Sequence, residues 1–320
     1  MRFLLLPFAI LYGLGVRLRH FLYDRGWLSS KRYPFPILCV GNLAVGGTGK
    51  TPMVEYLVRL LGQEQVAVLS RGYRRKTKGF VLADDSATAM TLGDEPYQYH
   101  RKFPRATVAV CENRQEGIER LLENPHFKYI ILDDAFQHRK VQAGTNLLLT
   151  SYDKLYTQDF LLPVGSLRDI RSRARKAQII IVTKCPELTQ AEQEKIIRQL
   201  KPLPSQKVYF TSIAYSDRVY SHEDSQALKD FITTPFTLVT GIANPTPLVD
   251  FLEKQGASFE HLAYSDHHHF SNRELEFLRQ KGRILTTEKD YVRLEGALPT
   301  LYYLPIETQF LNDQRLIFND

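Results

Sequence analysis

The chain has 320 residues, of which 43% are hydrophobic and 24% charged, and this is the composition of a globular protein with about two domains. Its formal net charge of +7 favours an anionic partner, namely a nucleic acid, an acidic membrane surface or a phosphorylated substrate. The three cysteines lack metal-type spacing, which excludes a cysteine-based metal site and indicates reduced, mostly buried thiols.

The chain opens with an apolar segment, Phe3 to Val16, which is followed directly by Arg17 and Arg19. This segment is too short to span a bilayer, which needs ~20 residues, and no small-residue cleavage site marks it as a signal peptide. Two interpretations remain: a helix lying in an anionic membrane surface, and a helix packed on the protein's own core. Because basic residues gather at the end of the apolar segment, residues 1–30 are predicted to form an amphipathic membrane-associating helix.

A glycine-rich loop at 44–51 lies between a strand-like run, Ile37 to Val40, and a helix-like run, Pro52 to Leu61. That order is the one a phosphate-binding P-loop requires, with backbone N–H groups around a polyphosphate, a lysine on the outer phosphates and a threonine hydroxyl on Mg²⁺. Ala44 stands where the motif usually has its first glycine. The predicted nucleotide-binding residues are Val45, Gly46, Gly47, Thr48, Gly49, Lys50, Thr51 and Pro52.

Strand-like and helix-like runs then alternate up to residue 182, which predicts an α/β fold with a parallel sheet of the P-loop NTPase type. Further strands are expected at 66–69, 107–110, 129–132, 146–149 and 179–182, and helices at 53–61, 95–102 and 114–124. After residue 205 the pattern begins again, with strands at 236–240, 259–262, 284–287 and 301–304 and helices at 247–255 and 272–280. We therefore expect a P-loop domain over 31–212 and a smaller α/β domain over 213–320 that closes a substrate cleft.

Two carboxylates, Asp133 and Asp134, follow the strand at 129–132. Adjacent carboxylates at the end of a buried strand are costly unless a cation or hydrogen-bond donors compensate them. In P-loop proteins an aspartate at this position holds Mg²⁺ beside the P-loop threonine, so Thr51, Asp133 and Asp134 are the predicted metal side. The alternative is a solvated strand end. Gln137 and His138 come next and are candidates for sensing phosphate or positioning the substrate.

Four further segments have both a functional and a structural interpretation. Asp94 is either a helix N-cap or a functional carboxylate, namely a general base or a member of the metal sphere. The loop at 264–270 holds three consecutive histidines, which cannot all face one metal, so it is either a surface turn or the source of a histidine that orients a carboxylate. Arg71 lies in a basic loop at the carboxyl end of the second strand, where open α/β sheets bind ligands; this loop is either a ligand site or a solvated basic loop. Arg168 leads into a basic run that is either a solvated helix face or a site for an acidic headgroup.

Two other nucleotide-dependent classes are disfavoured. Pro186 stands where a GTPase would have its guanine-reading aspartate, after Thr183 and Lys184. The catalytic and metal-binding loops of protein kinases are absent from the sequence.

Taken together, the motifs resemble the tetraacyldisaccharide 4'-kinase family, the lipid A 4'-kinases, from the N-terminal helix to near the C-terminus. The segments that carry this resemblance are Gly41-Asn42 before the P-loop, Ser70 to Tyr73, Gly93 to Pro96, Asp133 to His138, Leu162 to Arg168, Asp266-His267 and Thr287 to Asp290. The family usually has glutamate where this chain has Asp169, and that position is left without a role.

The resemblance implies a membrane-associated kinase that uses ATP and Mg²⁺ to phosphorylate the 4'-hydroxyl of tetraacyldisaccharide 1-phosphate, giving lipid IVA. Asp94 would be the catalytic base and His267 its partner from the second domain, and Lys50 would act on the transferred phosphate. The substrate or polar shell would comprise Arg71, Glu95, Gln137, His138 and Arg168. The expected location is the cytoplasmic face of the bacterial inner membrane, with peripheral or monotopic attachment.

Two rival classes remain on the sequence alone. A membrane-bound P-loop ATPase would dimerise on ATP and need no lipid acceptor. A nucleic-acid-binding ATPase is supported only by the net charge, and its affinity should fall steeply with salt. Neither explains a second domain with Asp266 and His267, so we expect no nucleic-acid partner and no obligate protein partner.

Overall fold

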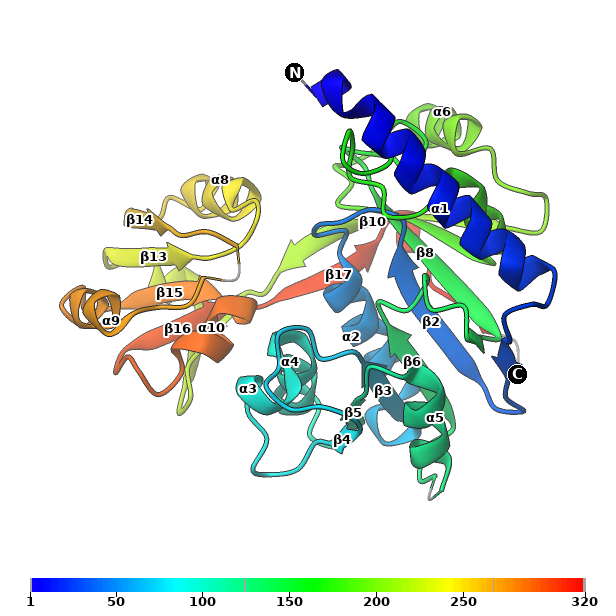
Figure 1. Ribbon diagram of the computed structural model, residues 1–320. Helices are drawn as coiled ribbons and strands as arrows, with labels where there is room; N and C mark the ends of the chain where they lie inside the picture. The colour runs from blue at the N-terminus through cyan, green and yellow to red at the C-terminus, as the bar shows by residue number, and fades with distance from the viewer. Residues whose placement is uncertain (1, 124, 267, 319–320) are drawn as a thin grey trace.

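The apolar runs of the first two thirds of the chain, together with one strand from near the C-terminus, form a nine-stranded sheet (Figure 1). The computed structural model describes residues 2–123, 125–266 and 268–318. The strands of this sheet are β2 (Ile37–Asn42), β3 (Val66–Ser70), β4 (Val81–Leu82), β5 (Thr107–Val110), β6 (Tyr129–Asp133), β8 (Thr145–Ser151), β9 (Ile179–Thr183), β10 (Lys207–Tyr215) and β17 (Ile306–Phe310). Their order is β17-β10-β9-β8-β2-β6-β3-β5-β4, and the edge strands β17 and β4 pair antiparallel to an otherwise parallel set.

Helices cover both faces of this sheet, as the alternation in the sequence predicts. Apolar side chains of α2 (Lys50–Leu61) and α4 (Asp94–Lys102) pack on one face, and those of α5 (Arg114–Leu122) and α6 (Gln190–Leu200) pack on the other. Shorter elements are α3 (Ala89–Leu92), the 3₁₀ turns η2 (Gln63–Gln65), η3 (Arg171–Lys176) and η4 (Leu311–Asp313), and the paired strands β1 (Lys31–Arg32) and β7 (Val141–Gln142). Both sheet faces are therefore buried, which is why the strands read as near-continuous apolar runs.

A second, six-stranded sheet forms the smaller unit. It has the order β12-β11-β16-β15-β13-β14, with the four strands from β16 to β14 parallel. The elements of this unit are β11 (Arg218–Tyr220), β12 (Ser225–Ala227), β13 (Phe236–Thr240), β14 (Phe259–Ala263), β15 (Ile284–Thr287), β16 (Leu301–Leu304), α7 (Leu228–Phe231), α8 (Thr246–Lys254), α9 (Asn272–Arg279) and α10 (Glu288–Leu294). The capping box expected from Ser271 and Glu274 opens α9.

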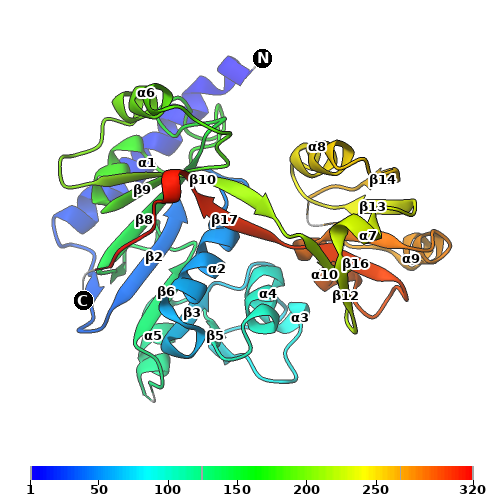
Figure 2. The same cartoon turned by 180° about the vertical axis from the view of Figure 1, so that it is seen from behind.

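Two strands connect the units, one in each direction. Strand β10 leads out of the large sheet, and β17 returns from the second unit and pairs antiparallel with β10, from Thr211 opposite Phe310 to Tyr215 opposite Ile306 (Figure 2). The expected boundary between 212 and 213 falls within β10, and residues 306–310 belong to the large sheet.

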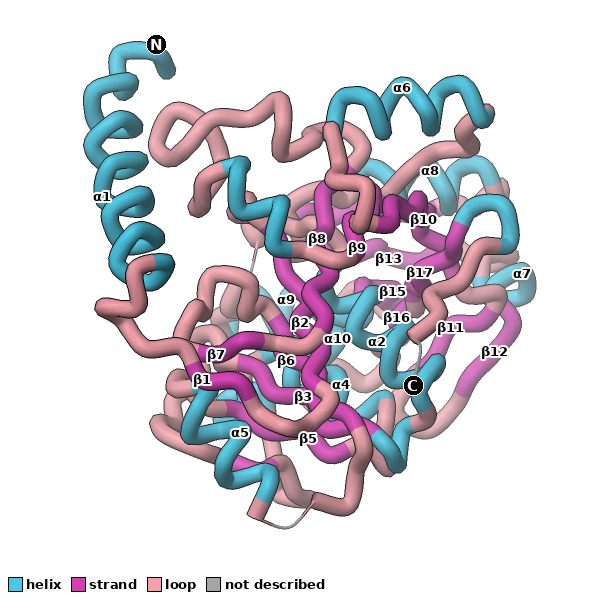
Figure 3. Tube along the Cα trace, turned by 90° about the vertical axis from the view of Figure 1, so that its right-hand side faces the viewer, coloured by secondary structure: helices cyan, strands magenta, loops and turns pink. Residues whose placement is uncertain are grey.

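Helix α1 (Leu6–Asp24), preceded by the 3₁₀ turn η1 (Arg2–Leu5), lies along the outside of the P-loop unit (Figure 3). Among the described residues, no helix is both long enough and apolar enough to cross a bilayer. Only Ala9, Gly13 and His20 of α1 are buried. Its exposed apolar residues include Leu6, Phe8, Ile10, Leu11, Leu14, Leu18 and Phe21. The helix therefore docks through a narrow face and leaves a broad apolar face uncovered.

Candidate active site

The P-loop lies where the sequence predicts it, between the buried strand β2 and helix α2. Gly46 and Gly49 have φ values of 108° and 77°, in the left-handed region that favours glycine. Gly49 is the N-cap of α2, so the glycines turn the chain sharply into the helix. The positive end of α2 and the N–H groups of the loop then face the same space, which suits a polyphosphate.

Hydrogen bonds with three other segments hold the P-loop in this shape. Asn42 donates from Nδ2 to Thr48 Oγ1 at 2.6 Å, and Thr183 donates from Oγ1 to the Thr48 carbonyl at 3.0 Å. The Val45 N–H donates to the Ser166 carbonyl at 2.8 Å. Strands β2 and β9 and the loop at 159–172 thus fix the P-loop together.

The two aspartates after β6 have different environments. Asp133 is buried and accepts a 3.1 Å hydrogen bond from Ser70 Oγ, and burial, assisted by the charge of Asp134, raises its pKa to about 7. Burial also acts to raise the pKa of Asp134, but Lys50 and Arg168 lower it below the ordinary value. Lys50 Nζ lies 3.8 Å from Asp134 Oδ1, and Arg168 pairs with both carboxylate oxygens of Asp134. Asp134 is therefore compensated by protein cations, whereas an ionised Asp133 would be stabilised by an added cation.

Arg168 and Gln137 both donate hydrogen bonds to the end of the P-loop strand β2. Arg168 donates to Asn42 Oδ1 at 2.6 Å, and Gln137 donates from Nε2 to the Asn42 carbonyl at 2.7 Å. His138 is partly buried, and burial together with the charge of Arg114 lowers its pKa to about 4, so its ring is neutral at neutral pH. Arg71 is exposed beside this group, and its charge acts on Arg114 and His138.

Asp94 lies where the two units meet. It is the first residue of α4, whose N-cap is Gly93, so the N-cap interpretation of Asp94 is wrong. Arg293 of α10 donates from Nε to Asp94 Oδ2 at 3.0 Å. Next to it, Lys289 Nζ lies 3.9 Å from Glu95 Oε1 and so bridges the same two helices.

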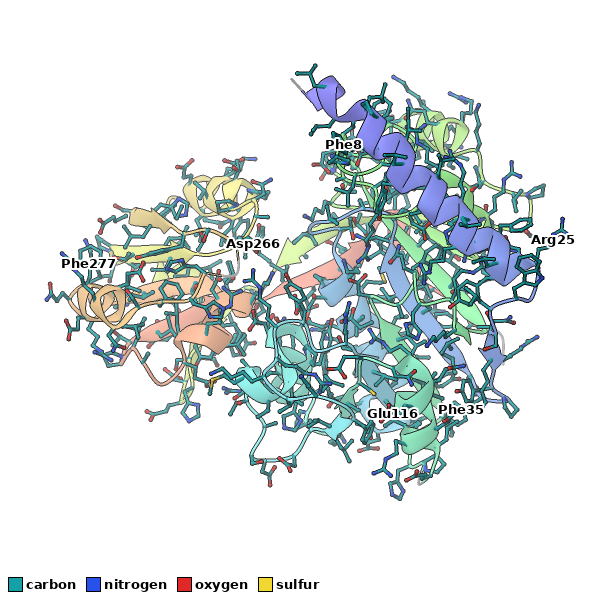
Figure 4. The ribbon with its side chains drawn as sticks, in the orientation of Figure 1. Phe8, Arg25, Phe35, Glu116, Asp266 and Phe277 are labelled. Atoms are coloured by element: carbon teal, nitrogen blue, oxygen red, sulfur yellow. The ribbon has the colours of Figure 1, made fainter. Side chains whose placement is uncertain are left out.

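The predicted partner of Asp94, His267, lies outside the described residues. The residue before it, Asp266, is on the side of the second unit that faces the P-loop unit, and it pairs with Lys289 at 3.4 Å (Figure 4). The residue after it, His268, contacts Glu274 Oε1 through Nε2 at 3.0 Å. Because Lys289 also pairs with Glu95 of α4, Asp266 lies close to the interface that holds Asp94.

Sequence reasoning missed the residues that hold the others in place. Arg293 and Ser70 received no role, although each contacts one of the candidate aspartates. Asp290 belongs to the motif Thr287 to Asp290, to which the sequence assigns no function. Arg293 follows Asp290 by three residues, and this helical spacing brings the two side chains together. That spacing is the one local signal for Arg293.

Helix α1 reaches the loops that carry the polar shell. Tyr12 donates from its hydroxyl to the Arg168 carbonyl at 2.8 Å, and Arg19 donates to the Gln137 carbonyl at 2.9 Å. His20 Nε2 and Asp169 Oδ1 lie 2.6 Å apart, and both side chains are buried. The residue left without a role in the sequence, Asp169, thus anchors α1.

A groove of about 470 Å³ lies between α1 and the loop at 159–172. It is largely apolar and is lined by Leu6, Ala9, Ile10, Arg17, Asp159, Phe160, Leu161, Val164, Leu167, Ile170, Arg171 and Ser172. A groove of this kind accepts hydrocarbon next to cationic side chains.

In this parallel sheet, the P-loop follows the central strand β2, and the aspartate pair stands at the end of the adjacent strand β6. This arrangement defines a P-loop nucleotide-binding protein. The family model described as tetraacyldisaccharide-1-P 4'-kinase (LpxK) matches residues 1–318. The chain therefore belongs to the tetraacyldisaccharide-1-phosphate 4'-kinase family.

Curated relatives and a solved structure agree with this membership. The chain is 48% identical to a tetraacyldisaccharide 4'-kinase of Flavobacterium johnsoniae, over 98% of this chain and 94% of that protein. It is 43% identical to a tetraacyldisaccharide 4'-kinase of Bacteroides thetaiotaomicron, over 98% and 90%. A crystal structure of LpxK from Aquifex aeolicus in complex with ATP superposes with a TM-score of 0.81 at 30% identity, covering 98% of this chain and 96% of that one. The predicted fold class is confirmed.

Proposed function

We propose that this chain transfers the γ-phosphate of ATP to the 4'-hydroxyl of tetraacyldisaccharide 1-phosphate and so forms lipid IVA. The observation that carries the proposal is the placement of Asp94 at the contact between the units of a protein that also has a braced P-loop and an aspartate pair. The family model and the names of the relatives support the same substrate.

The P-loop is the proposed site for the phosphates of ATP, bound by the N–H groups of residues 45–51 and by Lys50. Among the described residues, no three His, Cys, Asp or Glu side chains form a metal cluster. That fits Mg²⁺, which binds through one or two carboxylates together with waters and substrate phosphates. Thr51 and Asp133 would hold the ion, with Asp134 behind them, and when bound it would neutralise charge on the phosphates.

Asp94 is the proposed general base. Its carboxylate accepts the proton of the 4'-hydroxyl as that oxygen forms a bond to the γ-phosphorus, and the bond from the γ-phosphorus to the bridging oxygen breaks to release ADP. His267 is the proposed partner of Asp94. Lys50 balances charge on the transferred group, and Glu95 and Arg71 complete the polar shell.

The lipid and the membrane are assigned to the side of the P-loop unit that carries α1. The apolar groove beneath α1 suits acyl chains, and Arg168, Gln137 and His138 lie in the loops that α1 contacts. The exposed apolar face of α1 suits the outer part of a bilayer. We assign residues 1–30 to peripheral attachment at the cytoplasmic face of the bacterial inner membrane, the nine-stranded sheet with its helices to nucleotide binding, and the unit built on the six-stranded sheet to closure over the substrate.

The test is transfer of radiolabelled phosphate from ATP to tetraacyldisaccharide 1-phosphate in mixed detergent micelles. Wild type should give a Mg²⁺-dependent lipid product, and Lys50→Ala and Asp94→Ala should give almost none. Lys281→Ala, which removes a lysine paired with Glu260 in the second unit, is the matched control and should behave as wild type. Folded wild-type protein that hydrolyses ATP and dimerises without phosphorylating the lipid would overturn the proposal in favour of a P-loop ATPase.

A further inference from the structure

The candidate base is held by an arginine that comes from the other unit. Arg293 donates from Nε to Asp94 Oδ2 at 3.0 Å, and its side chain is only 6% exposed. The helices that carry the two residues, α10 and α4, lie next to each other where the units meet (Figure 1). A buried guanidinium of the second unit thus makes an ion pair with a carboxylate of the P-loop unit.

The guanidinium is fixed on its other side by a fully buried carboxylate. Arg293 donates from Nη1 to Asp290 Oδ1 at 3.1 Å, and Thr287 Oγ1 and the Gly241 N–H donate to Asp290 Oδ2 at 2.7 and 2.9 Å. A Cβ on Gly241 would lie 2.9 Å from Asp290 Oδ1, so this close approach of the backbone requires glycine. Because a buried carboxylate is costly without such donors, Asp290 is held firmly in place, and it fixes the Nη1 side of Arg293 in turn.

The guanidinium also has an unused donor. Nη2 of Arg293 is buried and has no hydrogen-bond partner among the described residues. In the planar fork of an arginine, Nε and Nη2 project from the same edge. The edge that contacts Asp94 therefore has a second donor, available to the same carboxylate or to an oxygen of a bound substrate.

We propose that Arg293 is a positioning residue for Asp94 in phosphoryl transfer, with Thr287 and Asp290 as its support. This inference rests on the proposed function, in which Asp94 accepts the proton of the 4'-hydroxyl. By fixing the Oδ2 edge of the carboxylate, Arg293 sets the direction of the remaining lone pairs relative to the acceptor hydroxyl. This role of Arg293 also gives the segment Thr287 to Asp290 a function, which the sequence alone does not assign: it holds the guanidinium in place.

The arrangement has a consequence for closure of the cleft. In addition to the Lys289–Glu95 pair, further ion pairs join α4 to α10 or to the residue just after it: Lys102 Nζ lies 2.8 Å from Glu288 Oε2, and Arg101 pairs with Glu295. Since Arg293 belongs to the second unit, Asp94 is aligned only while the two helices are in contact. Separation of the units would release the base from its support and so limit transfer to water.

A double-mutant cycle in the full chain tests the proposal. Arg293→Met, Asp94→Asn and the double variant are assayed for kcat and for the KM of ATP, with tetraacyldisaccharide 1-phosphate as acceptor and thermal unfolding measured in parallel. Arg293→Met should lower kcat about 10²-fold and leave the KM of ATP within about twofold. In the Asp94→Asn background the same change should lower kcat by less than about threefold, because a positioning residue has nothing left to position.

Two further variants separate positioning from support of the fold. Arg293→Lys keeps a cation beside Asp290 but loses the fork, and we expect an intermediate kcat. Arg279→Met is the matched control, since Arg279 is an exposed arginine of the second unit that donates to the Ala297 carbonyl at 3.0 Å, and its kcat should equal that of wild type.

The inference is overturned if Arg293→Met keeps the wild-type kcat, or if it loses the same factor in both backgrounds. Should Arg293→Met not fold, Arg293→Lys takes its place in the cycle, and equal losses in both backgrounds again overturn the inference. Wild type without lipid phosphorylation would overturn the proposed function and this inference together. An active wild type with an additive cycle would overturn the inference alone.

Discussion

Phe8 (Figure 4) and Leu11 lie about one helical turn apart on α1 and are 62% and 65% exposed. Neither side chain lines the groove beneath the helix. If this face attaches the protein to the bilayer, Phe8→Ser/Leu11→Ser should weaken membrane binding without disturbing the site. The contacts of α1 with Arg168, Gln137 and Asp169 come from Tyr12, Arg19 and His20, which the double variant leaves in place.

The size of the effect follows from the exposed area. Full burial of a leucine or phenylalanine side chain is worth ~2 kcal/mol. Because nearly two thirds of each side chain is exposed, their joint insertion contributes about 2.5 kcal/mol, and its loss should weaken vesicle partition about 60-fold.

The assay is sedimentation with vesicles of phosphatidylethanolamine and phosphatidylglycerol at physiological salt. Phe277→Ser is the matched control, since Phe277 is a 45% exposed phenylalanine of the second unit, and it should partition as wild type (Figure 4). Partition of the double variant within about threefold of wild type would refute membrane insertion of this face. Equal weakening by Phe277→Ser would show that the effect is not specific to α1.

The remaining predictions concern the site and its supports. The folded-state pKa of Asp133, about 7, lies above its unfolded value, so the stability that this group contributes is complete at acid pH and is lost as the pH rises through 7. Asp133→Asn should therefore raise the free energy of unfolding of the ligand-free protein by roughly 2–4 kcal/mol at pH 8, relative to wild type, and should change it little at pH 4. The same variant should abolish phosphate transfer. Urea unfolding at the two pH values measures the change in stability, and an equal effect at both would contradict the assigned burial. Lys50→Ala should lower kcat about 10²–10³-fold and raise the pKa of Asp134. The pKa is measured from the ¹³C chemical shift of the Asp134 carboxyl as a function of pH, and an unchanged pKa would count against the contact between Lys50 and Asp134. His20→Ala should destabilise the protein by about 1–3 kcal/mol, because it removes the side-chain partner of the buried Asp169 carboxylate and leaves it the Ile170 N–H; an unchanged melting temperature would argue against the His20–Asp169 pair.

The fold was largely predictable because both sheets leave strong local patterns. Strands β5, β13, β15 and β16 have the predicted bounds, since each is a short run rich in apolar and β-branched residues. Strand β17 was not predicted. Its sequence, Ile306 to Phe310, is apolar only at its two ends, and it pairs with a strand about a hundred residues earlier. No local signal encodes that return. Helix α6 was also not predicted, although Thr189 and Glu192 form a capping-box pattern that the sequence shows.

The site was predictable where a motif carries its own chemistry and not where a distant side chain completes it. The P-loop is recognisable in the sequence by its glycines and its lysine, and the metal side by the paired carboxylates of Asp133 and Asp134. The partners Arg293 for Asp94 and His20 for Asp169 lie 199 and 149 residues away along the chain, and only the packing of α10 on α4 and of α1 on its loops brings them together. The pairing of His267 with Asp94 stays a prediction.

The central claim is the identity of the transferred group and its acceptor atom. The most direct measurement is ³¹P NMR of the lipid formed from ATP and tetraacyldisaccharide 1-phosphate, with correlation of each phosphorus to the sugar protons. The account predicts one new phosphomonoester coupled to the proton at position 4' and an unchanged 1-phosphate. A pyrophosphate at position 1, or inorganic phosphate and ADP with the lipid unaltered, would contradict it.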